Sequence, residues 1–244
     1  MANKVKRAII MAAGLGKRMQ PVTSDIPKPL IIVNGKRMID TVIDALHEQG
    51  IYEIYIVVGY LKEKFEVLKE KYDGITFIEN PYYDSCNNIS SLYVARNHIE
   101  DAIILDGDQI IYNSRILDLN FEKSGYNCVW TDSETDEWLL EVEEGIVKKC
   151  SRNGGKKGWQ LYSVSRWSSS DANKLKHHLE IEFEEKKNRQ IYWDDVALFC
   201  YPEEYQLGIK EMKKEDIIEI DNITELIELD ESYRGYVSKG GRDE

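Results

Sequence analysis

Near its N-terminus the chain reads Ala8-Ile9-Ile10-Met11-Ala12-Ala13-Gly14-Leu15-Gly16-Lys17-Arg18-Met19, an apolar strand that runs directly into a turn with two glycines. Because glycine has no Cβ, the backbone at Gly14 and Gly16 can approach a phosphate group closely, and successive N–H groups there can bind an anion. Arg18 and, after the turn, Lys28 add positive charge that backbone groups cannot supply. The stretch therefore predicts a binding site for a nucleoside triphosphate.

Two better-known phosphate-binding loops do not fit this spelling. A P-loop has an earlier glycine, where this chain has Met11, and a Ser or Thr after the Gly-Lys pair, where this chain has Arg18. A dinucleotide-binding turn has a third glycine, where this chain has Met19, and that side chain would prevent close packing of helix on strand. We therefore expect a nucleotide site of another class.

Length and composition limit the possible functions. The chain has 244 residues, enough for one large α/β domain or two small ones. A net charge of −12 argues against nucleic acid as a partner. The four cysteines lack Cys-x-x-Cys spacing and are expected to be reduced core thiols. Since no segment approaches the ~20 apolar residues of a membrane helix, we expect a cytoplasmic protein that does not bind membranes.

The first half of the sequence alternates between strand and helix patterns. Strands are predicted at 8–11, 54–58, 75–78 and 103–105, and helices at 38–46, 62–71 and 90–98. Gly50 is placed to end the first helix, and Ser90 or Ser91 could cap the last one. This alternation predicts right-handed crossovers and a mostly parallel sheet flanked by helices.

The second half reads differently. Short antiparallel strands are predicted at 128–131, 139–143, 146–150 and 160–164. A long charged helix at 171–187 follows, with short apolar segments at 196–200 and 217–220 and a final helix at 223–233. The charge run within 182–187 is expected to be a solvated helix face.

Two carboxylates, Asp106 and Asp108, stand directly after the strand predicted at 103–105 and are separated by Gly107. In open α/β sheets, ligands bind beyond this end of the strands. Carboxylates so close together repel each other unless a cation or hydrogen-bond donors neutralise them. Mg²⁺ prefers one or two carboxylates together with phosphate oxygens, so the pair is a candidate magnesium site, with a plain Asp-Gly-Asp turn as the alternative.

The glycine turn, Arg18 and the later segment Pro27-Lys28-Pro29-Leu30 together resemble the signature of the nucleotidyltransferases that make activated sugars and alcohols from nucleoside triphosphates. The resemblance implies a Rossmann-like α/β domain in which Arg18, Lys28 and Asp108 are catalytic. It also implies that Asp221 joins Asp108 in holding Mg²⁺, with Asp106 in support. The loop residues that it implies in nucleotide binding are Ala12, Ala13, Gly14, Leu15, Gly16 and Lys17. The chain departs from the family at Gln20, where a basic residue is common.

Within the family, nearly the whole chain resembles the bacterial choline-phosphate cytidylyltransferases of the LicC type. The similarity is carried by Val58-Gly59-Tyr60-Leu61-Lys62-Glu63, Asn87-Asn88-Ile89-Ser90-Ser91-Leu92-Tyr93, Glu137-Trp138 and Tyr192-Trp193-Asp194. It implies that Asn87, Asn88 and Ser90 read a pyrimidine base, the alternative being a capped helix N-terminus. We accordingly expect one nucleotidyltransferase domain over 1–238, with a nucleotide-binding part at about 1–125, an acceptor-binding part at about 126–238 and a tail at 239–244.

The aromatic residues Trp138, Tyr192 and Trp193 bear on the acceptor. A quaternary ammonium has no N–H to donate and is bound by aromatic faces, each contact contributing roughly 0.5–2 kcal/mol. Glu137 and Asp194 would add negative charge beside these rings. Trp and Tyr are more often core residues, and Ser163 stands where the family often has glycine, so the cage is a hypothesis that depends on the resemblance.

The resemblance implies transfer of CMP from CTP to phosphocholine by direct in-line attack, giving CDP-choline and pyrophosphate with Mg²⁺ as cofactor. One alternative is a cytidylyltransferase for 2-aminoethylphosphonate or phosphoethanolamine, whose primary ammonium requires carboxylates. Others are a sugar-1-phosphate nucleotidyltransferase and, least favoured, a non-catalytic nucleotide-binding module. The sequence does not predict the oligomeric state.

Overall fold

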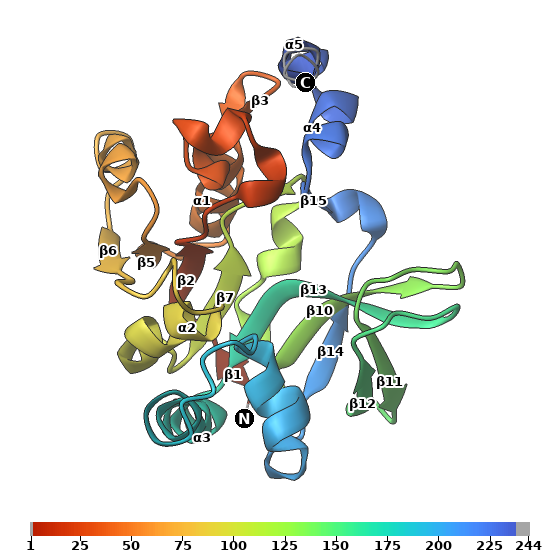
Figure 1. The fold of residues 1–244 in the computed structure, drawn as a ribbon. Coiled ribbons are helices and arrows are strands. Elements are labelled where there is room, and N and C mark those ends of the chain that lie inside the picture. The colour runs from red at the N-terminus through yellow and green to blue at the C-terminus, as the bar shows by residue number, and fades with distance from the viewer. Residues whose placement is uncertain (1, 238–244) are drawn as a thin grey trace.

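The computed structural model describes residues 2–237, and its main element is a mixed sheet of nine strands (Figure 1). The strands lie in the order β10-β14-β12-β11-β13-β7-β2-β5-β6. Their bounds are β2 Arg7–Ala12, β5 Glu53–Val58, β6 Ile75–Glu79, β7 Ala102–Asp106, β10 Gly125–Thr131, β11 Leu139–Glu143, β12 Ile146–Ser151, β13 Gly158–Trp167 and β14 Gly208–Glu211. The expected α/β fold is confirmed.

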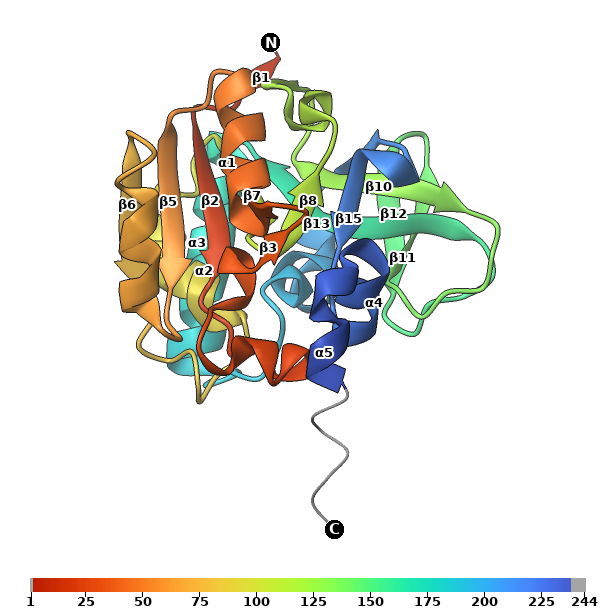
Figure 2. The same cartoon turned by 90° about the horizontal axis from the view of Figure 1, so that it is seen from above.

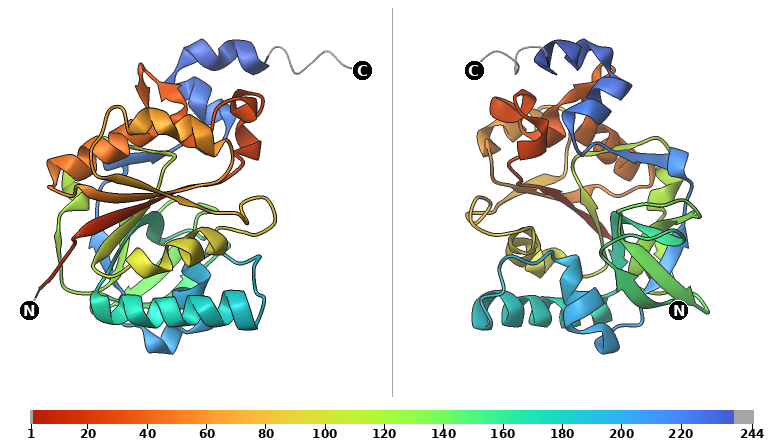
Figure 3. Two further views of the ribbon diagram at one scale, coloured as in Figure 1. Left: turned by 90° about the vertical axis from the view of Figure 1, so that its left-hand side faces the viewer. Right: turned by 45° about the vertical axis from the view of Figure 1, so that its right-hand side comes forward.

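The parallel half consists of β7, β2, β5 and β6. The helix α1 (Met38–Glu48) covers one face of this half, and α2 (Ile89–Ala95) and α3 (Ser169–Glu180) cover the other (Figures 2 and 3). In α1 the buried residues Ile39, Val42, Ile43 and Leu46 repeat at helical spacing, which explains why this segment packs on the sheet. Gly50 follows the helix with φ +81°, as expected for a C-terminal glycine.

The long strand β13 joins the two halves of the molecule. It pairs antiparallel with β7 through residues 164–167 and with β10 over 158–166. The antiparallel strands therefore continue the central sheet instead of forming a separate one, and the division near residue 125 stays a prediction.

The remaining elements are short. The strands are β1 Asn3–Lys4, β3 Ile32–Val33, β4 Lys36–Arg37, β8 Gln109–Ile111, β9 Asn120–Phe121 and β15 Ile217–Glu219. The C-terminal helices are α4 Ile223–Leu229 and α5 Arg234–Val237. Leu226 of α4 and Ile220 before it pack with Ile31 and Val33. This packing places α4 against the segment 31–33, which follows the Pro27–Leu30 motif.

Several predicted helices differ in the structure. The segment 62–71 forms only a 3-10 helix, Lys62–Leu68, and α2 begins at Ile89 without a side-chain cap and ends in a 3-10 turn. The long helix ends its α-helical part at Glu180 and continues as a π-helix, and 196–200 is a second π-helix. The last helix breaks at Asp230, whose side chain accepts from the N–H groups of Ser232 and Asn34.

The charge run near 182 is not simply a solvated face. Glu182 is 1% exposed, and its carboxylate accepts from Lys186 at 2.7 Å, Asn188 at 2.9 Å and Tyr201 at 2.9 Å. These three hydrogen-bond donors offset the cost of burying the carboxylate. The charge pattern of 182–187 could not predict them, because Tyr201 lies outside that segment.

Three further expectations concern the cysteines, the membrane and the tail. The four cysteines are free thiols, with Cys128 and Cys150 buried and Cys86 and Cys200 partly exposed. None of the helices within residues 2–237 is long and apolar enough to cross a membrane. The predicted tail at 239–244 lies outside the described residues.

Candidate active site

The glycine turn forms one wall of a cavity of about 250 Å³ at the end of β2. Gly16 has φ +60°, and a Cβ there would lie 2.9 Å from Thr23 Cγ2 and 3.3 Å from Lys28 Cβ. Only glycine fits this conformation without displacing its neighbours. The sequence-predicted residues that line the cavity are Ala12, Gly14, Gly16, Lys17, Arg18, Lys28, Asp108 and Asp221.

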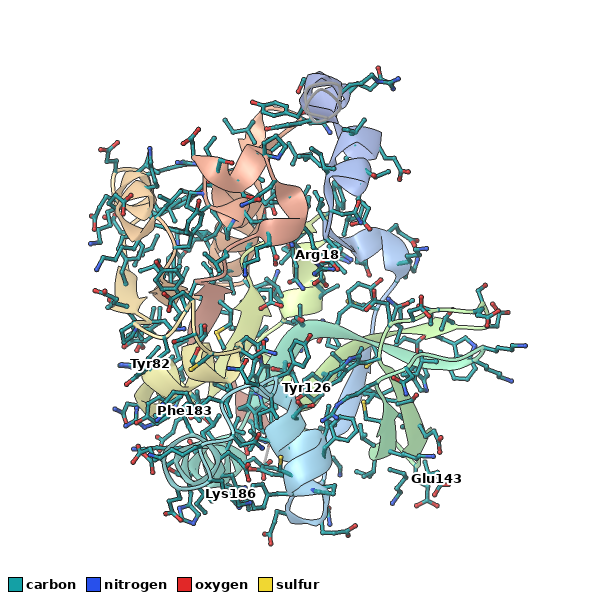
Figure 4. All side chains as sticks on the ribbon, viewed as in Figure 1. Arg18, Tyr82, Tyr126, Glu143, Phe183 and Lys186 are labelled. Atoms are coloured by element: carbon teal, nitrogen blue, oxygen red, sulfur yellow. The ribbon has the colours of Figure 1, made fainter. Side chains whose placement is uncertain are left out.

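Two cations and two carboxylates meet in this cavity, one of them Arg18, which is labelled in Figure 4. Lys28, which is 8% exposed, places Nζ 2.5 Å from Asp108 Oδ2 and 3.3 Å from Asp221 Oδ1. Arg18 donates to both oxygens of Asp221, at 3.1 and 2.8 Å. Burial alone would lower the pKa of Lys28, but Asp108 and Asp221 outweigh burial and raise it, so the ammonium stays charged.

Three carboxylates form a second cluster beside these pairs. Asp106, Asp108 and Glu219 each place an oxygen within 4.8 Å of the others. Burial raises the pKa of Asp106 to about 8, and the charges of Asp108 and Asp194 add to the effect, while a hydrogen bond from Ser163 opposes it. Clustered carboxylate oxygens that repel one another are a donor set that fits Mg²⁺.

The sequence did not predict Glu219 at this site. Antiparallel pairing of β15 with β8 sets Glu219 opposite Gln109, next to Asp108 in the chain. Asp221 accepts from Arg18 and Lys28 in this ligand-free structure, and its role as a metal ligand stays a prediction. The sequence could have suggested Glu219, because it lies two residues before Asp221 and alternate residues of an extended chain share one face.

A second cavity, of about 300 Å³, adjoins the glycine turn. Its lining includes the predicted residues Ala13, Gly14, Asn87, Asn88, Ser90, Asp106 and Asp108. Asn80, which the sequence did not suggest, is 1% exposed and donates to the hydroxyls of Ser90 and Ser91 at 3.0 Å each. The predicted serine cap of α2 is wrong, because Ser90 donates backward to the carbonyl of Asn87 at 2.8 Å.

The predicted acceptor residues separate into two groups. Trp138 meets Tyr192 edge-on with ring centroids 5.6 Å apart, and it meets Phe199 in the same way at 5.6 Å. Trp193, however, is 2% exposed and packs in the core between Tyr126 and Trp167. The Trp193 ring was expected in an aromatic cage, but it packs in the hydrophobic core.

Asp194, which follows Trp193 in the chain, is another of the predicted acceptor residues. It is 8% exposed, and its carboxyl lies beside the buried hydroxyl of Tyr126, which is labelled in Figure 4. Burial raises the pKa of Asp194 to about 7, a hydrogen bond from the hydroxyl of Tyr126 opposes this, and the charges of Asp195 and Glu219 add to the rise. Glu137 is exposed for most of its surface, and partial burial followed by the charge of Asp221 raises its pKa.

The chain matches the model of the MobA-like NTP transferase domain over residues 8–166. It is 37% identical to the 2-aminoethylphosphonate cytidylyltransferase of Lancefieldella rimae, covering 93% of this chain and 92% of that protein. It is 32% identical to the choline-phosphate cytidylyltransferase of Streptococcus pneumoniae, covering 92% and 97%.

Among solved structures, the CTP:phosphocholine cytidylyltransferase from Streptococcus pneumoniae superposes with a TM-score of 0.84, at 32% identity over 94% of this chain and 99% of that one. The family match covers more than half of the 244 residues, and both relatives align over almost the full length. The chain is therefore an enzyme, a nucleotidyltransferase that belongs to the MobA-like NTP transferase family.

Proposed function

We propose that this enzyme transfers CMP from CTP to a small phosphonate or phosphate monoester with a primary ammonium group, and that 2-aminoethylphosphonate is its preferred acceptor. The use of CTP is supported by the relatives at 37% and 32% identity, which are both cytidylyltransferases. The acceptor class is supported by one observation, the buried carboxyl of Asp194, which has the hydroxyl of Tyr126 beside it but no ion-pair partner among the described residues.

The chemistry of the two ammonium types separates the acceptors. A primary ammonium has three N–H donors, whereas a quaternary ammonium has none. A buried carboxylate without an ion-pair partner is costly, and an ammonium donor would reduce this cost by neutralising the charge. Asp194 Oδ1 would accept one such hydrogen bond, and Trp138 and Tyr192 would cover the carbon chain of the acceptor.

In the proposed reaction, an oxygen of the acceptor's phosphonate or phosphate attacks the α-phosphorus of CTP in line. The bond from that phosphorus to the oxygen bridging to the β-phosphorus breaks, and pyrophosphate leaves. Lys28 would stabilise the negative charge that develops around the α-phosphate, and Arg18 with the N–H groups near Gly14 and Gly16 would bind the leaving phosphates.

Both cations would have to exchange carboxylate partners for phosphate oxygens when CTP binds, because Lys28 contacts Asp108 and Asp221 in the ligand-free protein and Arg18 contacts Asp221. Asp106, Asp108 and Glu219 would hold Mg²⁺, with Asp221 at their side. When bound, the ion would neutralise phosphate charge and orient the triphosphate.

Phosphocholine is the second candidate acceptor. The perpendicular pair Trp138 and Tyr192 offers aromatic surface for a quaternary ammonium, and Tyr192 is 47% exposed. The Streptococcus pneumoniae relative acts on this acceptor by its name. The burial of Trp193 argues against phosphocholine, because only two of the three expected rings, Trp138 and Tyr192, then remain for the ammonium.

The test is pyrophosphate release from CTP and Mg²⁺ with 2-aminoethylphosphonate, phosphoethanolamine, phosphocholine and glucose-1-phosphate in parallel. We expect the highest kcat/KM with the two primary amines, and Asp194→Asn should reduce that preference. A higher kcat/KM with phosphocholine would contradict the proposed acceptor class while keeping the cytidylyltransferase. No turnover with any of the four acceptors would contradict the cytidylyltransferase proposal itself.

A further inference from the structure

The proposed acceptor residues Trp138, Tyr192 and Asp194 come from two segments far apart in sequence. Arg152 contacts both segments, through Trp138 and through Asp195. Arg152 lies in the turn between β12 and β13, which belongs to the antiparallel part of the sheet. Its Nε and Nη2 donate to Oδ1 of Asp195 at 2.9 and 2.5 Å. The guanidinium also lies over the ring of Phe199, 3.8 Å from its centroid, and 5.7 Å from the ring centroid of Trp138.

Asp195 uses its second oxygen to shape the turn that carries the acceptor residues. Its Oδ2 accepts from the N–H of Tyr192 at 2.9 Å, and its own N–H donates to the carbonyl of Tyr192 at 3.2 Å. The N–H of Trp193 donates to Oδ1 of Asn88 at 2.9 Å. The turn 192–195 is thus held on one side by the nucleotide pocket and on the other by Arg152.

Arg152 offsets the free-energy cost of burying the Asp195 carboxylate in the turn 192–195. Asp195 is 3% exposed, and a buried carboxylate is costly unless it is paired and hydrogen-bonded. Among the side chains of residues 2–237, Arg152 supplies the one ion pair of Asp195. A lysine could supply charge but not the two-pronged contact, nor the planar stacking on Phe199.

We propose that Arg152 is a positioning residue for acceptor recognition, which fixes the turn 192–195 and supports Trp138 so that Tyr192, Trp138 and Asp194 keep the geometry that binds the amine end of the acceptor. This inference rests on the proposed function in taking those three residues as the acceptor site. In this proposal Arg152 acts through its contacts with Asp195 and Trp138. Because Arg152 neutralises Asp195, Asp194 is the carboxyl of the turn 192–195 that has no ion-pair partner among the described residues.

The test compares steady-state constants of Arg152→Met and Arg152→Lys with a matched control on the same hairpin. Lys149→Met is that control, because Lys149 is 70% exposed on β12 and makes only a 3.6 Å surface ion pair with Glu141. For Arg152→Met we expect about a tenfold higher KM for the acceptor, with kcat and the KM for CTP within about twofold. Arg152→Lys should recover part of the loss, and Lys149→Met should behave as wild type.

The constants are measured with whichever acceptor the unmodified enzyme uses best, so the identity of that acceptor tests the proposed function separately. Thermal unfolding of each variant checks that it is folded at the assay temperature. Asp195→Asn combined with Arg152→Met should show no further loss beyond Arg152→Met alone, because both changes break the same contact. An unchanged acceptor KM, or an equal rise in the KM for CTP, would overturn the inference.

Discussion

Replacing Asp194 by Asn should stabilise the ligand-free protein at neutral and alkaline pH while weakening acceptor binding. The carboxyl is 8% exposed, and its neighbours include the hydroxyl of Tyr126 but, among the residues described, no ion-pair partner. Burial, with the charges of Asp195 and Glu219 added, raises its pKa from 3.8 to about 7. The folded protein therefore disfavours the ionised form, and asparagine keeps the shape of the side chain without that charge.

The sign and size of the effect follow from linkage. Between pH 3.8 and about 7 the folded state binds more protons at Asp194 than the unfolded chain does. The free energy of unfolding therefore falls as the pH rises through this window. The full cost, reached above about pH 7, is at most about 4 kcal/mol, since each pKa unit corresponds to about 1.4 kcal/mol. Below about pH 4 the cost vanishes.

The assay is urea denaturation of wild type and Asp194→Asn in metal-free buffer from about pH 4 to about pH 8. The stability advantage of the variant should grow across this range by a few kcal/mol. Asp195→Asn is the control, because that carboxylate is paired with Arg152 and its removal should destabilise the protein at neutral pH. A pH-independent difference between Asp194→Asn and wild type, or a variant less stable at about pH 8, would refute the assignment.

Three further predictions concern catalysis and binding. Lys28→Ala should lower kcat by at least about a hundredfold while CTP still binds, as measured by pyrophosphate release and calorimetry; near-normal turnover would remove Lys28 from the mechanism. Trp138→Ala should raise the KM for the acceptor several-fold more than the KM for CTP, and a parallel rise in both would count against the proposed acceptor residues. Thr23→Val should lower kcat/KM for CTP about tenfold, because Thr23 is 0% exposed and donates to the carbonyl of Gly16 at 2.8 Å, whereas Thr23→Ser keeps that bond and should stay close to wild type.

The parts of the site that could be predicted are local in sequence. The turn from Gly14 to Arg18 determines its own backbone, and the strand–helix pattern around it indicated the parallel sheet, which the structure confirms. The family and the class of enzyme could be recognised from the same motif, and the match over residues 8–166 confirms both.

The parts that could not be predicted depend on distant partners. Glu219 reaches the carboxylate cluster only because β15 pairs with β8, more than a hundred residues earlier in the chain. Trp193 and Tyr192 are neighbours in sequence, yet one ring packs in the core and the other is 47% exposed. The partners that decide the burial of Trp193 are Tyr126 and Trp167, from two strands of the antiparallel part.

The ion pairs among the described residues distinguish Asp194 from two other carboxylates of the site. Asp195 is paired with Arg152, and Asp221 is paired with Arg18 and Lys28. Within the part of the chain that the structure describes, Asp194 has no such cation, although it is only 8% exposed. An uncompensated buried charge lowers stability, so retaining it requires a compensating role. Since the phosphate end of the site already has Lys28 and Arg18, the missing cation at Asp194 matches the opposite end of an acceptor that carries a phosphonate at one end and an ammonium at the other.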